Sequence, residues 1–165
     1  MADVAPDLKT PTDLNRNDTR TVAEALNIAL ADCFALYLKT KNFHWHVSGP
    51  HFRDYHLMFD DQAAQILGIT DAIGERVRKT SQTTLRSIGD IGRHQTIVDN
   101  DHDYVSADEM LAELREDNLK LIAVFRDARE RAEEANDTAT SSIVDDWIDQ
   151  AEERAWFLFE TARKG

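Results

Sequence analysis

The sequence predicts an all-α fold, a four-helix bundle with one long crossover between the second and third helices. Apolar residues recur at steps of three and four through four long stretches, at about 18–46, 50–79, 106–135 and 139–163, which is the period of a helix with one buried face. The link between the first and second stretches is short, and so is the link between the third and fourth. Helices joined by short links are antiparallel neighbours. About 25 residues separate the second stretch from the third, enough to run the length of a bundle.

Composition favours one soluble domain. The 165 residues, 42% of them hydrophobic and 30% charged, suffice for a substantial core. Residues 1–16 contain two prolines and no apolar periodicity, so we expect a flexible N-terminal tail before a bundle at 17–165. No apolar run approaches the ~20 residues of a membrane helix, and the N-terminus lacks the charged-then-apolar order of a secretion signal. We expect a cytoplasmic protein that does not enter membranes.

The first helix is predicted from about residue 18 to 46. Thr21 and Glu24 have the spacing of a capping box, and the expected inward residues are Val22, Leu26, Leu30, Cys33, Leu36 and Tyr37. Because Cys33 is the single cysteine, no intrachain disulfide can form, and its apolar setting favours a core position. His44 is expected near the C-terminal end of this helix.

The second helix is predicted from Pro50 to about Lys79, since a proline is tolerated in the first helical turn. At roughly 100° per residue, one broad stripe of this helix is apolar and should face the core: Phe52, Tyr55, Phe59, Ile66, Ile69, Ile73 and Val77. A different face carries small residues between charged ends: Asp60, Ala63, Ala64, Leu67, Asp71, Gly74 and Glu75.

The crossover is acidic, and the last two helices follow it. Asp99, Asp101 and Asp103 imitate the opening of a calcium loop, but the expected glycine is absent and Met110 replaces the closing glutamate, which favours a solvated loop. A capping box of Ser106 and Glu109 opens the third helix. The fourth helix should bury Val144, Trp147, Ile148, Ala151, Ala155, Leu158 and Phe159, and we expect Trp156 in the core as well.

Two imidazoles and three carboxylates stand at intervals of 12, 4, 11 and 4 residues: His44, His56, Asp60, Asp71 and Glu75. Nitrogen and carboxylate oxygen at helical spacings are typical of a metal site. His56 and Asp71 are 15 residues apart, and a rise of ~1.5 Å per residue puts them roughly 22 Å apart along one helix. Metal bonds to such ligands are only about 2.0 to 2.2 Å long, so one chain cannot close the site.

A second copy of this helix would close it. Antiparallel pairing across a two-fold axis near Leu67 would bring the carboxylate end of one chain opposite the histidine end of the other, and such a self-complementary contact makes two equivalent sites. Gly68 and Gly74 fit this arrangement. A glycine within a helix costs about 1 kcal/mol relative to alanine, and that cost is easier to understand where two backbones approach closely.

These motifs resemble a known family. KNFHWHVSG, then His56-x-x-x-Asp60, then Asp71-x-x-x-Glu75 are similar to the Dps family of ferritin-like iron-oxidising cages, and the helix layout is similar over nearly the whole chain. The resemblance implies a ferritin-like bundle with a short helix at about 84–91 within the crossover. It implies a hollow homo-dodecamer built from two-fold dimers, which stores iron and protects against oxidative damage.

The resemblance also implies roles for residues. The ferroxidase centre would take His44, His56 and Asp60 from one subunit and Asp71 and Glu75 from its neighbour, with hydrogen peroxide as the favoured oxidant of Fe(II). Trp45 could relay an electron or intercept radicals, although packing against the dimer contact explains it equally well. The family admits iron through acidic pores at three-fold axes, for which the candidates are Asp137, Asp145, Asp146 and Asp149. A solvated helix start explains these carboxylates equally well.

Two points bear on the metal. Nitrogen and oxygen ligands without thiolate suit Fe(II) but tolerate Zn(II), Mn(II) or Co(II), so iron is favoured by the resemblance, and other divalent metals would compete for the site. No histidine has a glutamate three residues before it. That absence argues against an ordinary ferritin site within one bundle.

Two other functions stay open, a nucleoid protein that coats DNA and a structural protein whose motif no longer binds iron. The net charge is −12, and the tail sets Asp3, Asp7 and Asp13 against Lys9 and Arg16. Neutralising DNA phosphates requires clustered cations, so we expect no DNA binding through this tail. All five candidate ligands are present, which disfavours a structural protein that has lost iron binding.

Overall fold

The computed structural model describes residues 4–163, which form five α-helices and no strand. They are α1 (Arg16–His46), α2 (Phe52–Lys79), α3 (Ile88–His94), α4 (Ala107–Glu134) and α5 (Thr138–Thr161), and a 3-10 helix, η1, spans Pro6–Leu8. The predicted all-α bundle with one long crossover carrying a short helix is confirmed. Residues 1–3 of the predicted tail, including Asp3, and residues 164–165 of the predicted bundle domain lie outside the described residues.

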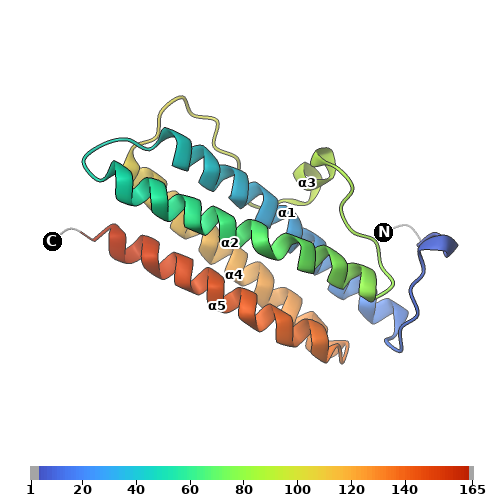
Figure 1. Ribbon diagram of the computed structural model, residues 1–165. Coiled ribbons are helices and arrows are strands. Elements are labelled where there is room, and N and C mark those ends of the chain that lie inside the picture. The colour runs from blue at the N-terminus through green and yellow to red at the C-terminus, as the bar shows by residue number, and fades with distance from the viewer. Residues whose placement is uncertain (1–3, 164–165) are drawn as a thin grey trace.

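The four long helices form two antiparallel pairs. In Figure 1, α1 and α2 lie over α4 and α5, and α1 packs against α2, α4 and α3. The crossover leaves the end of α2, carries α3 over α1, and returns to the opposite end of the bundle, where α4 begins. One long side of α2 is left exposed at Asp60, Ala64, Leu67, Gly68, Asp71 and Glu75.

Helix caps follow the predictions only in part. The Ser106 hydroxyl accepts a hydrogen bond from Glu109 N at 3.3 Å, and the Glu109 carboxylate accepts one from Ser106 N at 2.9 Å, so the capping box of α4 is confirmed. The box predicted at Thr21 is wrong, because α1 begins earlier. Asn15 caps it by accepting a hydrogen bond from the amide two residues later at 2.9 Å, and Thr21 lies inside the helix.

The core confirms most of the apolar pattern but corrects the aromatic residues. Cys33 and Trp147 are buried as predicted, and burial raises the pKa of the Cys33 thiol to about 12. Trp156 is 60% exposed, Phe159 47% and Phe52 46%, contrary to prediction. The reason in α5 is that aromatic residues come on successive positions near its end, so they cannot all share its inward face.

A buried carboxylate fixes the crossover onto α1. Asp32 is fully buried and accepts hydrogen bonds from Thr96 N at 2.5 Å, from the Thr96 hydroxyl at 2.7 Å and from Ile97 N at 3.0 Å. The short helix before this point starts later than predicted, at Ile88. Its N-cap is Ser87, whose hydroxyl accepts a hydrogen bond from the amide of residue 90 at 3.1 Å. Because an N-cap residue does not have helical backbone angles, the helix cannot begin before Ile88.

The N-terminal segment lies against the end of α2. Thr10 N donates to the Ser81 hydroxyl at 3.0 Å, and an Nη of Arg78 donates to the Leu8 carbonyl at 2.5 Å. Leu8 and Thr10 therefore have hydrogen-bond partners in the bundle, which the composition of the tail did not indicate.

Among the described helices, α1 alone is long and apolar enough to cross a membrane, although polar residues interrupt its apolar sequence. Its apolar stretch is 67% buried inside the bundle, as in the core helix of a soluble protein.

Candidate metal centre

The link between α1 and α2 brings two histidines into contact. His44 lies in the last turn of α1 and His56 in the second turn of α2, and Gly49 takes a φ of +118° in the turn between them, where a side chain would be strained. The two imidazole rings stack with centroids 3.8 Å apart and an interplanar angle of 23°. Each ring Nδ1 lies 2.8 Å from the backbone oxygen of the other residue.

These reciprocal contacts assign the protons on the rings. A carbonyl oxygen can only accept, so Nδ1 of His44 and Nδ1 of His56 must both donate. In the neutral imidazole, the lone pair then lies on Nε2, which is free of other partners among the hydrogen bonds of the described residues. Metal-bound histidines commonly donate their second ring N–H to a backbone carbonyl in this way. The pair is therefore oriented as metal ligands would be.

Asp60 follows one turn after His56 and adds a carboxylate. Lys41 Nζ donates to its Oδ1 at 2.6 Å, and this hydrogen bond lowers the pKa of Asp60, with a smaller contribution from the charge of Lys41. Lys41 Nζ also lies 5.8 Å from the ring centroid of Trp45, whose side chain is 57% exposed. Lys41 thus contacts both the Asp60 carboxylate and the Trp45 indole.

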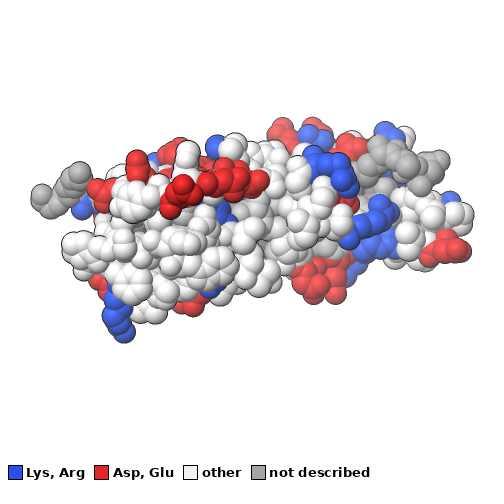
Figure 2. All heavy atoms as spheres, turned by 90° about the horizontal axis from the view of Figure 1, so that it is seen from above, with Lys and Arg blue, Asp and Glu red and all other residues white. Residues whose placement is uncertain are grey.

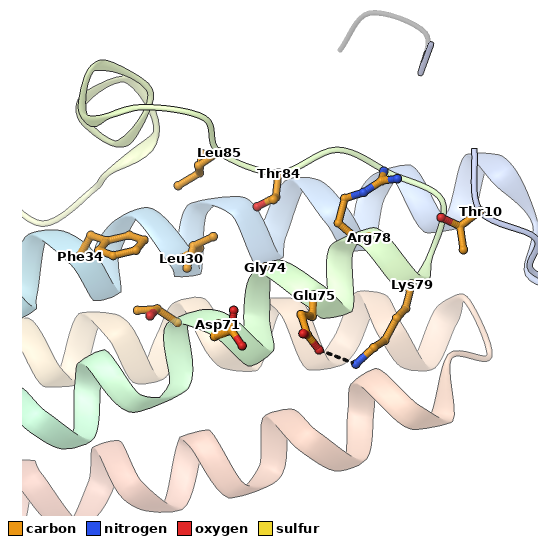
Figure 3. A pocket seen from close by; sticks show the side chains of 11 residues that line it. Thr10, Leu30, Phe34, Asp71, Gly74, Glu75, Arg78, Lys79, Thr84 and Leu85 are labelled. Carbon is orange, nitrogen blue, oxygen red and sulfur yellow. Dashed lines mark hydrogen bonds and ion pairs between the residues drawn. The ribbon is translucent and has the colours of Figure 1, made fainter. Parts of the chain in front are cut away.

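The other two predicted ligands border a groove at the far end of α2. Asp71 and Glu75 lie on its wall together with Gly74, and Figure 3 shows the two side chains on successive turns of α2. Glu75 Oε2 accepts from Lys79 Nζ at 3.0 Å, one turn along the helix. The groove has a volume of about 600 Å³.

The chain does not bring the five ligands together. His44, His56 and Asp60 lie near the start of α2, and Asp71 and Glu75 lie near its end. A separation of roughly 22 Å between His56 and Asp71 follows from the rise per residue. Within residues 4–163, no group of three or more His, Cys, Asp or Glu side chains could hold a metal ion. Between the two groups, Leu67 is 41% exposed, and a Cβ added at Gly68 would meet no atom within 4 Å. The intervening face is open.

The four acidic pore candidates differ in their surroundings. Asp137 is 3% exposed, caps α5 by accepting from Thr140 N at 3.1 Å, and pairs with Arg76 at 2.7 Å, so its carboxylate serves the fold. Asp145 pairs with Arg129 at 2.5 Å, and Asp146 and Asp149 are exposed.

Sequence reasoning missed the cations beside the ligands. Lys41 precedes Trp45 by four residues, and Lys79 follows Glu75 by four residues. Side chains at that spacing are neighbours on a helix, so the signal was present for both. The contact of Lys41 with Asp60 joins two helices, and no local spacing could have shown it.

Comparisons with known proteins agree with this architecture. A family model described as a ferritin-like domain matches residues 23–164. The DNA protection during starvation protein 1 of Deinococcus radiodurans is 30% identical over 145 residues, which is 88% of this chain and 70% of that protein. The DNA protection during starvation protein of Brevibacillus brevis is 30% identical over 137 residues, covering 83% and 91%. The crystal structure of a Dps protein from Bacillus brevis matches with a TM-score of 0.86 at 28% identity, covering 91% and 100%.

Proposed function

Since this chain belongs to the Dps family of ferritin-like proteins, we propose that it oxidises Fe(II) to Fe(III) at sites shared between two copies and stores the product. Family membership supports the iron-storage and protective function. The observation that carries the shared site is the division of the ligands. Imidazoles with free Nε2 atoms lie at one end of an exposed helix face, and two carboxylates lie at its other end.

Antiparallel pairing of two copies of α2 would bring the histidine end of one copy opposite the carboxylate end of the other. With a two-fold axis between residues 65 and 66, Asp71 of one copy lies opposite Asp60 of the other, and Glu75 lies opposite His56. The residues near the axis are Ala64, Leu67 and Gly68, which are all exposed. Neither Gly68 nor Gly74 is needed for close packing within the chain, which supports a role in contact with a second copy.

The ligand set suits the proposed chemistry. Two Fe(II) ions would each give one electron to one hydrogen peroxide molecule, which takes up two protons and yields two water molecules. Carboxylates favour the product because they stabilise the added charge on Fe(III), and neutral imidazoles hold Fe(II) before oxidation. Trp45, beside the site, could supply an electron if peroxide is reduced in single steps. Zn(II) would compete for the same nitrogen and oxygen ligands.

We expect hydrogen peroxide to oxidise bound Fe(II) faster than dioxygen does. The expectation rests on the match of all five ligand positions to the Dps pattern. It is checked by loading the protein with Fe(II) without air, adding either oxidant in equal electron equivalents, and comparing initial rates by Fe(III) absorbance. Equal or faster oxidation by dioxygen would refute the preference for peroxide.

The proposed assembly is a cytoplasmic homo-dodecamer, with iron entering at three-fold axes. Asp146 and Asp149 are exposed pore candidates, and Asp145 forms an ion pair with Arg129. Acidic groups gathered around a pore would concentrate cations. The mass of the particle and the effect of Asp146→Asn and Asp149→Asn on the iron uptake rate test these two parts separately.

Binding of duplex DNA is not expected at physiological salt. Figure 2 shows a largely uncharged face, on which lysines and arginines gather toward one end with carboxylates next to them, and the net charge of the chain is −12. Affinity for phosphates needs several clustered cations and falls steeply with salt. A gel shift at about 150 mM salt, with chelator present to prevent metal bridging, checks this. Retardation of the duplex by micromolar protein would favour a nucleoid function instead.

A further inference from the structure

We propose that the core of the bundle holds a small monovalent anion of halide size, bound by the guanidinium of Arg154. The two Nη atoms of this side chain are buried and have no hydrogen-bond partner among residues 4–163. Buried donors without a protein partner commonly mark the place of an ion or a water, and a positive charge favours an anion. The inference does not rest on iron oxidation, and it adds a ligand of the opposite charge to iron.

The guanidinium of Arg154 lies in the centre of the bundle. Arg154 follows Ala151 by three residues and precedes Leu158 by four, so it shares their buried face of α5, and it is only 1% exposed. Its Nε donates to Oδ1 of Asn118 on α4 at 2.8 Å, and Nδ2 of Asn118 donates to the Leu114 carbonyl at 2.8 Å. The planar guanidinium is therefore held at one edge, and both Nη atoms remain for a ligand.

Within the described part of the chain, no carboxylate pairs with this charge. Asp32 accepts its hydrogen bonds from the crossover, and Asp117 pairs with Lys39. The Cys33 thiol is close enough to interact electrostatically with Arg154, but burial raises the pKa of this thiol to about 12, so the thiol is neutral at pH 7.

The guanidinium itself keeps its charge at neutral pH. Burial lowers the pKa of Arg154 to about 10, which leaves the side chain protonated at pH 7. A buried charge is costly unless it is paired and hydrogen-bonded. An anion taken from solvent would supply the missing charge and would accept hydrogen bonds from both Nη atoms.

A groove between α2 and α5 reaches this position and limits the choice of anion. The groove has a volume of about 410 Å³, and its lining includes Arg154 and Gln62, which are 1% and 5% exposed. Gln62 Nε2 donates to the Arg154 carbonyl at 3.4 Å. Asp54, Asp61 and Glu153 also line the groove, and their charges repel multivalent anions such as phosphate. Close packing of the core and this acidic lining together favour a small ion with a single charge.

Chloride and bromide are the probes, because both are small, monovalent and able to accept hydrogen bonds. Thermal unfolding of the metal-free, full-length protein is followed by circular dichroism while chloride replaces gluconate at constant ionic strength, so that general screening stays equal. Gluconate is too large for the packed core. Arg154→Met removes the charge and keeps an unbranched stem. Arg126→Met is the matched control, because Arg126 forms an exposed ion pair with Glu152.

We expect the Tm of the parent and of Arg126→Met to rise by about 5 °C or more between chloride-free buffer and about 0.3 M chloride, as for a ligand well above its dissociation constant. The Tm of Arg154→Met should be the same in chloride and in gluconate. A parent Tm that does not respond to chloride, or an equal rise in Arg154→Met, overturns the inference.

Crystals of the parent protein, grown without halide and soaked in bromide, decide the question even if Arg154→Met does not fold. The anomalous scattering of bromide should give a peak within hydrogen-bonding reach of both Nη atoms of Arg154. Water alone at this position, with bromide found only on the surface, overturns the inference. None of these results bears on the proposed function, which fails only if the parent protein does not oxidise Fe(II).

Discussion

Replacing Asp71 and Glu75 by alanine is expected to lower the initial rate of Fe(II) oxidation by at least about 100-fold. Even residues that only support metal ligands cost about 10- to 100-fold when removed, and this change removes two ligands from every site. The double change His44→Ala and His56→Ala should have an effect of the same size, since it removes both imidazoles. Initial rates with peroxide at equal protein concentration measure the loss.

The matched control for the carboxylate variant is Glu130→Ala with Glu134→Ala. These two residues have the same four-residue spacing and are exposed on α4, away from α2. Their removal changes the net charge equally, so it separates loss of ligands from loss of general attraction for cations. Equal loss of rate in the control, or a full rate in the Asp71 and Glu75 variant, would contradict the ligand assignment.

Lys39→Met is expected to destabilise the protein by about 3–5 kcal/mol, which is the usual cost of removing one partner of a buried ion pair. Lys39 Nζ lies 2.6 Å from Asp117 and 2.8 Å from Glu113, and the side chains of Lys39 and Asp117 are only 4% and 3% exposed. Without the ammonium, Lys120 at 3.6 Å is the one cationic partner that Asp117 keeps among residues 4–163. Glu113 is 32% exposed and can regain water.

Thermal unfolding followed by circular dichroism checks this expectation, with a decrease in Tm of about 10 °C for a chain of this size. The companion variant carries Lys39→Met together with Asp117→Leu, so that no charge is left buried alone. It should recover most of the loss, because well-packed apolar side chains often replace a buried ion pair without cost. A double variant as unstable as Lys39→Met alone would show that packing around the stem, and not the unpaired carboxylate, causes the effect.

The four long helices could be predicted from the sequence because their apolar residues recur with the period of a buried helix face. Ser106 and Glu109 fixed the start of α4 through a purely local pair of hydrogen bonds, which sequence spacing reveals. The division of the five candidate ligands between the two ends of α2 could be predicted for a similar reason. Helical rise alone shows that His56 and Asp71 cannot meet within one chain.

Contacts between distant segments could not be predicted. Asp137 has the spacing of a cap, but only the fold shows that Arg76 neutralises it. Arg154 is 1% exposed in the bundle, where Nε donates to Asn118 at 2.8 Å and burial lowers the pKa of the guanidinium to about 10. Its two Nη atoms have no hydrogen-bond partner among the described residues. A charged residue is usually read as exposed, although the positions of Ala151, Ala155 and Leu158 place Arg154 on the inner face of α5.

Mixing the two ligand variants tests the shared site most directly. One chain carries His44→Ala and His56→Ala, and the other carries Asp71→Ala and Glu75→Ala, so neither homodimer has a complete site. In a mixed dimer, the imidazoles of the second variant face the carboxylates of the first and rebuild one site, while the other site loses all four side chains.

The two chains are co-expressed with different affinity tags, and mixed particles are verified before the rate of Fe(II) oxidation by peroxide is measured. Random pairing of equal amounts makes about half of the dimers mixed, so roughly a quarter of all sites should return. Recovery of about a quarter of the parent rate is the result that the shared site predicts. A rate that stays at the level of the separate variants, in particles shown to contain both chains, would contradict it.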